Sequence, residues 1–194
     1  MVAAGNNDHS LRYLTDPGKD WTPFTAELIN AYINHLKTLY DLGARKMLLV
    51  SVYPVGCNPV LLQFLNKTTC VDELNSAVMG FREQLLRVVK RKAELGMPLA
   101  KFSVLNSAKI LLDVINNPQP TGMRYVRGMC CELAPGSGSC ARNGRLCKNR
   151  QEYLFMDGVH LTSAGSAILA DKAYNSKDAY PINLKELYLS FYKF

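Results

Sequence analysis

The chain lacks any apolar run of the length that crosses a membrane. Its longest mostly apolar stretches, such as residues 46–57, fall short of the ~18 residues that a transmembrane helix needs. Residues 1–8 contain no basic region followed by a long apolar segment, so they do not have the pattern of a secretory leader. We therefore expect no integral membrane segment. The missing leader indicates either a cytosolic protein or a sequence without its natural beginning.

Several common functional motifs are also missing. There is no Gly-x-Ser-x-Gly nucleophile turn and no Cys-x-x-Cys pair, and His160 is the only histidine near the cysteine cluster. A structural zinc site is therefore disfavoured, and we expect no metal. The net charge is +7, but the one dense basic run, residues 85–96, fits the solvated face of an amphipathic helix. We accordingly predict no nucleic-acid partner.

What the sequence does contain is typical of a globular enzyme or binding protein. Its 194 residues are 48% hydrophobic and 20% charged, which suits one domain spanning residues 1–194 with a sizeable core. Six cysteines, four of them within 18 residues, favour disulfides and an oxidising compartment. They are Cys57, Cys70, Cys130, Cys131, Cys140 and Cys147. The triplet Asn66-Lys67-Thr68 is a candidate glycosylation site between the first two.

Hydrophobic periodicity predicts alternating strands and helices. Residues 22–44 have a helical apolar stripe, with Thr25 as the expected N-cap and Gly43 as the stop. The apolar run at residues 46–52 that follows is typical of a buried parallel strand. The same periodicity predicts strands at 2–5, 100–106 and 152–157 and helices at 70–96, 107–118 and 162–175, the last capped by Thr162 or Ser163. It leaves an irregular segment at 119–150 and a tail that packs on the body. This alternation predicts an α/β fold with a parallel sheet.

Two polar stretches follow expected strands and so fall where α/β sheets place their sites. Asp157 and His160 are three residues apart, close enough for the carboxylate to orient the imidazole as a general base. Asn7, in Gly-Asn-Asn-Asp, has an amide that can donate to a developing oxyanion. Each pattern alone has an ordinary explanation, because D-x-x-H pairs are frequent and Gly, Asn and Asp are turn residues.

Taken in order, these segments resemble plant-type GDSL esterases/lipases of the SGNH hydrolase superfamily. The resemblance rests on residues 5–8 (GNND), 39–59, ending in PVGCNP, 70–75 (CVDELN), 117–131, ending in a double cysteine, 147–165 around DGVH, and 181–187 (PINLKEL). It covers essentially the whole chain. It implies a flavodoxin-like three-layer α/β/α sandwich.

The resemblance also implies a function. Members hydrolyse carboxylic esters, often acyl lipids, with a Ser-His-Asp triad and without metal or cofactor, and most are secreted. His160 matches the family's base, Asp157 its orienting acid and Asn7 an oxyanion-hole donor. Gly5 belongs to the same motif as Asn7. All six cysteines match family positions thought to form disulfides, with Cys57–Cys70 the pair expected first. The implied partner is a small ester or acyl-lipid substrate; nothing indicates the oligomeric state.

The chain departs from the family pattern at one decisive point. The Gly-Asp-Ser block that carries the nucleophilic serine is absent, so we expect a sheet incomplete on its amino-terminal side and no catalysis by this chain alone. Ser10, Ser51 and Ser163 lie nearest the motifs, but none is in a recognisable nucleophile turn. Smaller departures are His9, Met156 and Leu161. The alternative function is an inactive relative that binds lipids or acyl esters.

Overall fold

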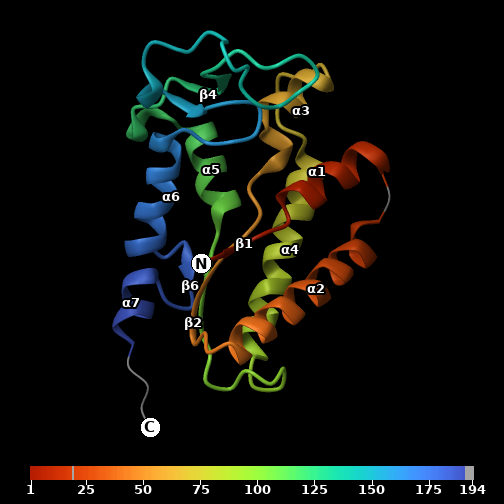
Figure 1. Ribbon diagram of the computed structural model, residues 1–194, viewed down its shortest axis with the longest axis vertical. Helices are drawn as coiled ribbons and strands as arrows, with labels where there is room; N and C mark the ends of the chain where they lie inside the picture. The colour runs from red at the N-terminus through yellow and green to blue at the C-terminus, as the bar shows by residue number, and fades with distance from the viewer. Residues whose placement is uncertain (19, 191–194) are drawn as a thin grey trace.

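The computed structural model describes residues 1–18 and 20–190 (Figure 1). A four-stranded sheet of order β1-β2-β3-β6 forms its centre. The strands are β1 (Val2–Ala3), β2 (Lys46–Val50), β3 (Lys101–Leu105) and β6 (Ala179–Tyr180). β1, β2 and β3 run parallel, as predicted, whereas β6 is antiparallel. Sequence analysis missed β6 because a two-residue strand has no periodicity to detect.

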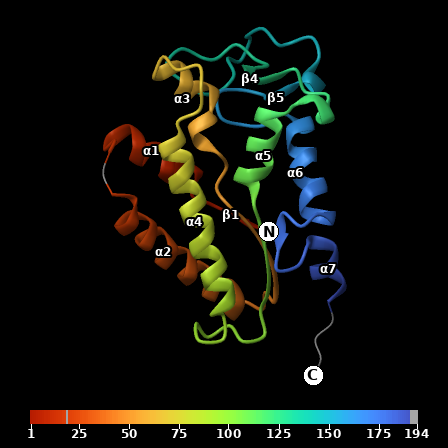
Figure 2. The ribbon, with the colours of Figure 1, turned by 180° about the vertical axis from the view of Figure 1, so that it is seen from behind.

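Helices cover both faces of this sheet. α2 (Trp21–Asp41) and α4 (Asp72–Lys90) lie on one face, and α5 (Ser107–Asn116) and α6 (Ser163–Asn175) lie on the other (Figures 1 and 2). Met47 and Leu49 of β2 join the first core, and Leu48 and Val50 join the second. Alternate residues of a strand point to opposite faces, so the continuous apolar run is buried on both sides. The expected three-layer α/β fold is confirmed.

The helix ends correct one prediction. α2 begins at Trp21, and its N-cap is Asp20, whose carboxylate accepts a hydrogen bond from the backbone N–H of Thr22 at 2.9 Å. Thr25 is therefore not the cap; it lies inside the helix and is buried. Pro23 does not break the helix because the first turn needs no donor at that position. Of the two caps predicted for α6, the structure has Thr162, whose hydroxyl oxygen accepts from the Gly165 N–H at 3.0 Å.

A second layer of structure sits above the carboxyl ends of the strands. β4 (Tyr125–Met129) and β5 (Tyr153–Phe155) form a separate two-stranded parallel sheet rather than joining the main one. Disulfides join Cys130 to Cys147 and Cys131 to Cys140 within the intervening segment. The third disulfide is Cys57–Cys70, the pair that we expected first. These crosslinks fix a segment that has little regular structure of its own.

The remaining helices are short or unexpected. α1 (Asn6–Thr15) follows β1 directly, although the sequence there favours a turn. α3 (Pro59–Phe64) follows the short 3-10 helix η1 (Val55–Cys57), and α7 (Leu184–Leu189) packs Leu187 against the body. Within residues 1–18 and 20–190, β1 pairs with β2 alone and so forms one edge of the sheet. No helix in these ranges is both long and apolar enough to span a bilayer.

Candidate active site

An Asp–His pair is built into the loop between β5 and α6. The Nδ1–H of His160 donates to the Asp157 carboxylate, at 2.8 Å from Oδ2 and 3.1 Å from Oδ1. Oδ1 also accepts the backbone N–H groups of Val159 and His160, at 2.9 and 2.7 Å. The Asp157 side chain is 9% exposed and that of His160 is 71% exposed. The loop therefore holds the acid in place and presents the imidazole at the surface.

The environment of Asp157 keeps it ionised. Burial raises its pKa, but the hydrogen bonds from the backbone of His160 and Val159 and from the His160 ring outweigh burial, so the pKa lies below the usual value. An ionised carboxylate accepting the Nδ1–H fixes the tautomer that leaves Nε2 free to take a proton. The pair thus has the chemistry of a general base with its orienting acid.

The Gly-Asn-Asn-Asp stretch lies at the start of α1. Gly5 is the N-cap residue, with φ of 107°, and a Cβ there would lie 2.8 Å from Val52 Cγ2. Only glycine suits this position, because it needs both the left-handed conformation and the space. The Asn6 side chain accepts the backbone N–H of Tyr53 at 2.9 Å, which ties α1 to the segment after β2.

A cleft joins these two regions, which are about 150 positions apart in the sequence. It has a volume of about 910 Å³, and Gly5, Asn7 and His160 all line it, with Asp157 behind His160. Tyr53, Val55 and Asn58, from the segment after β2, complete one wall. The structure therefore brings together Asn7 and His160, whose side chains we assigned to one site.

Sequence reasoning missed Asn6, Tyr53 and Asn58 as parts of this site. Tyr53 and Asn58 follow a buried strand at its carboxyl end, which is itself a signal for a site-forming segment. Asn6 is adjacent to Asn7 and chemically identical to it. The sequence therefore could not show that Asn6 bonds to the backbone of Tyr53 while Asn7 is the candidate oxyanion donor. Of the three serines considered, Ser10 lines the cleft. Ser51 is buried and bonded to Ser107, and Ser163 does not line the cleft.

No serine hydroxyl of the described residues is hydrogen-bonded to His160. Ser10 and Ser166 share the cleft, but both lie within helices rather than in a turn between a strand and a helix. The same residues contain no group of three His, Cys, Asp or Glu side chains suited to a metal ion. Asn66 is exposed, with φ of 51°, in the loop between α3 and Cys70.

Comparison with known proteins assigns the family. The GDSL-like Lipase/Acylhydrolase profile matches residues 1–173. Among curated proteins of Arabidopsis thaliana, GDSL esterase/lipase At1g29670 is 34% identical and At1g29660 is 32% identical, each over 96% of this chain. The matched region is 54% of each relative, so the chain spans about half the length of the curated relatives it matches. The chain belongs to the GDSL-like lipase/acylhydrolase family.

Proposed function

We propose that the cleft is the active site of a carboxylic ester hydrolase, with His160 as base, Asp157 as its orienting acid and Asn7 as an oxyanion donor. The observation that carries the proposal is the 2.8 Å bond from His160 Nδ1 to Asp157 at a cleft that Asn7 also lines. Family membership supports hydrolase chemistry. We also propose that residues 1–194 belong to a single hydrolase domain that needs neither metal nor cofactor.

The mechanism needs a serine, and we infer that it lies outside residues 1–194. In this chemistry a serine oxygen attacks the ester carbon while its proton passes to His160 Nε2, and Asn7 donates to the developing oxyanion. The protonated imidazole then gives its proton to the departing alcohol, and water releases the acyl group by the reverse path. Without the serine hydroxyl there is no covalent step, so the described groups alone support little turnover.

The open surroundings of His160 support a contribution from elsewhere. His160 is largely exposed. In the part of the chain that the structure describes, β1 pairs on one side only, and its carboxyl end, at Ala3 and Ala4, borders the same cleft. A further parallel strand added to β1 would end beside that cleft. A serine in the turn after such a strand would face the imidazole.

The walls of the cleft and the disulfides indicate substrate class and compartment. Leu11, Val55, Val159 and Leu161 give the cleft apolar lining beside its polar residues, which suits an ester with an acyl chain. Three disulfides favour an oxidising compartment, so we propose that the protein is secreted and acts on acyl esters or lipids. The exposure of Asn66 agrees with glycosylation there.

A binding role is the second candidate. It is favoured by one observation: His160 is bonded to no serine hydroxyl among the described residues. A protein of this kind would keep the apolar walls of the cleft and hold an acyl ester without cleaving it. It would bind a long-chain p-nitrophenyl ester without releasing p-nitrophenol, whether or not His160 is present.

Hydrolysis of p-nitrophenyl butyrate distinguishes the two. We would assay residues 1–194 and the longest in-frame product of the natural transcript, each with and without His160→Gln and Asp157→Asn. We expect turnover from a product that carries a Gly-Asp-Ser segment, falling at least ~10³-fold in each variant. Turnover that survives His160→Gln, or turnover by residues 1–194 alone, would overturn the proposal as stated.

A further inference from the structure

The end of the sheet opposite the cleft has a high net positive charge. Residues 37–46 and 87–101 meet there, because β2 and β3 are parallel and Lys46 pairs with Lys101 in register. The two segments hold eight lysines and arginines and two acidic residues, a net of +6 against +7 for the whole chain. Residues 37–46, 87–101 and 188–189 are called here the basal surface.

Large apolar side chains are exposed among these cations. Leu42 and Leu99, in the loops that lead to β2 and β3, are 80% and 60% exposed. Tyr188 and Leu189, at the end of α7, are 77% and 53% exposed. The Lys46 ammonium donates to the Tyr188 carbonyl at 2.7 Å, so α7 ends beside the same strand termini. The basal surface therefore combines exposed cations with exposed apolar groups.

In the last turn of α4, two cations of the basal surface have no carboxylate partner among the described residues. Arg87 and Lys90 make no ion pair with any described residue, and Arg91 pairs only with the exposed Glu94, at 2.7 Å. Burial and, second, the charge of Lys101 lower the pKa of Lys92. The α4 dipole favours cations in its last turn, but it gives no reason for the exposed leucines beside them.

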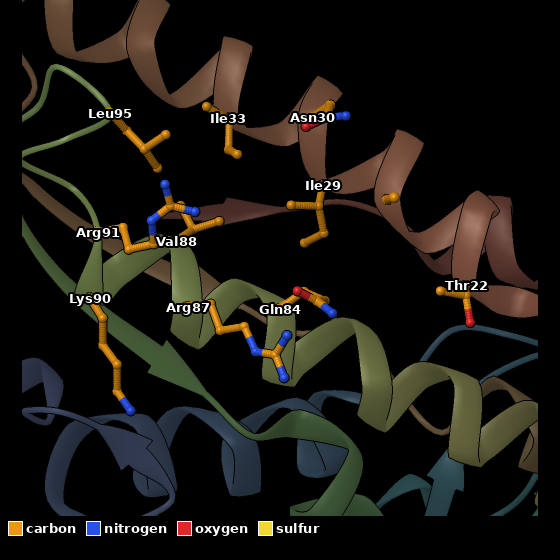
Figure 3. A pocket seen from close by; sticks show the side chains of 11 residues that line it. Thr22, Ile29, Asn30, Ile33, Gln84, Arg87, Val88, Lys90, Arg91 and Leu95 are labelled. Carbon is orange, nitrogen blue, oxygen red and sulfur yellow. The ribbon is translucent and has the colours of Figure 1, made fainter.

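An apolar groove borders the basal surface. It lies between α2 and α4, has a volume of about 480 Å³, and has Ile29, Ile33, Val88 and Leu95 among its lining residues (Figure 3). In the same view Arg91 extends across it toward α2, while Lys90 points away from α2. An amphiphile could thus place carbon chain against the groove and an anionic group against the arginine.

We propose that the basal surface attaches the protein to bilayers rich in acidic phospholipid. Exposed leucines that enter the interface and basic residues that meet anionic headgroups are the two contributions that peripheral attachment needs. A nucleic acid would use the cations but gain nothing from Leu42 and Leu99. The attachment stands independently of the catalytic proposal. It leaves the cleft at the far end of the sheet, directed away from the bilayer.

Vesicle co-sedimentation of the chain tests this. Vesicles of phosphatidylcholine alone are compared with vesicles containing phosphatidylglycerol, for the unmodified protein and for Arg87→Gln/Lys90→Gln and Leu42→Gln/Leu99→Gln. The matched controls are Arg142→Gln/Lys148→Gln and Leu146→Gln, exposed residues of the cysteine-rich segment. We expect binding to the acidic vesicles only, weakened roughly 10-fold or more by each basal pair and unchanged in the controls.

Three results would overturn the proposal. In the first, the unmodified protein binds the two kinds of vesicle equally or binds neither. This comparison does not depend on whether any variant folds. Another is equal weakening by the control substitutions. The third has two parts: only the arginine–lysine variant loses binding to vesicles, and the unmodified protein binds a single-stranded oligonucleotide as tightly as it binds vesicles. That result would mean that the basal surface binds polyanions in general. Because no arm measures hydrolysis, the proposed catalytic site can fail or succeed separately.

Discussion

The Nδ1 atom of His9 lies 2.8 Å from the carbonyl oxygen of Gly5, within the first turn of the helix that carries Asn7. A carbonyl can only accept, so Nδ1 carries the proton and donates it. The ring is completely buried, stacked on Trp21 with centroids 5.7 Å apart and edge-on to Phe81 at 5.4 Å. Its Nε2 has no hydrogen-bond partner among the residues that the structure describes. His9 therefore holds the start of α1 as a neutral side chain.

This arrangement makes stability depend on pH. Burial lowers the pKa of His9 below 6.5, more than its bond to Gly5 and the charge of Asp8 raise it. The unfolded chain then binds more protons than the folded one, so the free energy of unfolding falls as the pH drops below about 6.5. We expect urea unfolding between pH 7.5 and 5 to show this loss, and His9→Phe, which keeps an aromatic ring, to show less of it.

The exposed His35 provides the control for that experiment. His35→Gln should retain the pH dependence of the unmodified chain. If His9→Phe and the unmodified chain lose stability in parallel over this range, the buried imidazole is not the titrating group. Asp157 does not interfere, because its lowered pKa places its own contribution at more acidic pH.

Gly5→Ala should destabilise the fold more than a glycine substitution in a comparable backbone conformation. Gly5 and Gly43 have φ values of 107° and 103°, but a Cβ meets Val52 Cγ2 at 2.8 Å only at Gly5, while at Gly43 nothing lies within 4 Å. Gly43→Ala is expected to cost about 1 kcal/mol for the backbone, and Gly5→Ala about 1–3 kcal/mol more for overpacking. Chemical denaturation of both variants measures the difference; equal costs would contradict the tight contact.

Asn75→Ala should remove a bond that holds the segment after β2. The buried Asn75 Oδ1 accepts the N–H of Gly56 at 3.0 Å, and Nδ2 lies 3.3 Å from Cys57 Sγ. Without the amide a buried N–H is left unsatisfied, which costs about 1–3 kcal/mol. Asn30→Ala, at an exposed helical position, should change stability by less than ~0.5 kcal/mol. Thermal unfolding of the two variants side by side is the measurement.

Removing the Cys57–Cys70 disulfide should also destabilise the segment after β2, because Cys57 belongs to that segment. The bond spans 13 residues, for which loop entropy in the unfolded chain predicts a loss of about 3 kcal/mol. Guanidinium denaturation of Cys57→Ala/Cys70→Ala measures that loss. A change below about 1 kcal/mol would mean that the surrounding contacts, and not the crosslink, hold η1 beside the cleft.

The parts of the fold that could be predicted are those with a local cause. After its first lysine β2 is a continuous apolar run, α5 has a clear helical stripe, and Thr162 is a strong capping residue. The loop carrying Asp157 and His160 was predictable for the same reason, because its hydrogen bonds join residues two or three positions apart. Such features need only their own segment of sequence.

The parts that escaped prediction depend on distant residues. α1 begins with Gly-Asn-Asn-Asp, which locally favours a turn, but the helix gains a buried contact between His9 and aromatic rings of α2 and α4. β6 exists because Ala179 and Tyr180 reach the edge of β3. The hydrogen bond that Asn6 accepts comes from the backbone of Tyr53, 47 positions away. No local pattern reports these partners.

The order of strands in the sheet also bears on how the protein folds during synthesis. Lys46 pairs with Lys101 and Val50 with Leu105, so the two central strands are 55 residues apart in the sequence. β2 can pair with β1 as soon as it is made, but it must wait for β3 to leave the ribosome before the two central strands can pair. At typical synthesis rates of about 5–20 residues per second that wait lasts several seconds. During this time Leu48 and Val50 of β2 lack the residues of α5 and α6 that share their core in the folded protein. The nascent chain is then at its most vulnerable to aggregation, and chaperone binding at that stage would govern how much protein reaches the folded state.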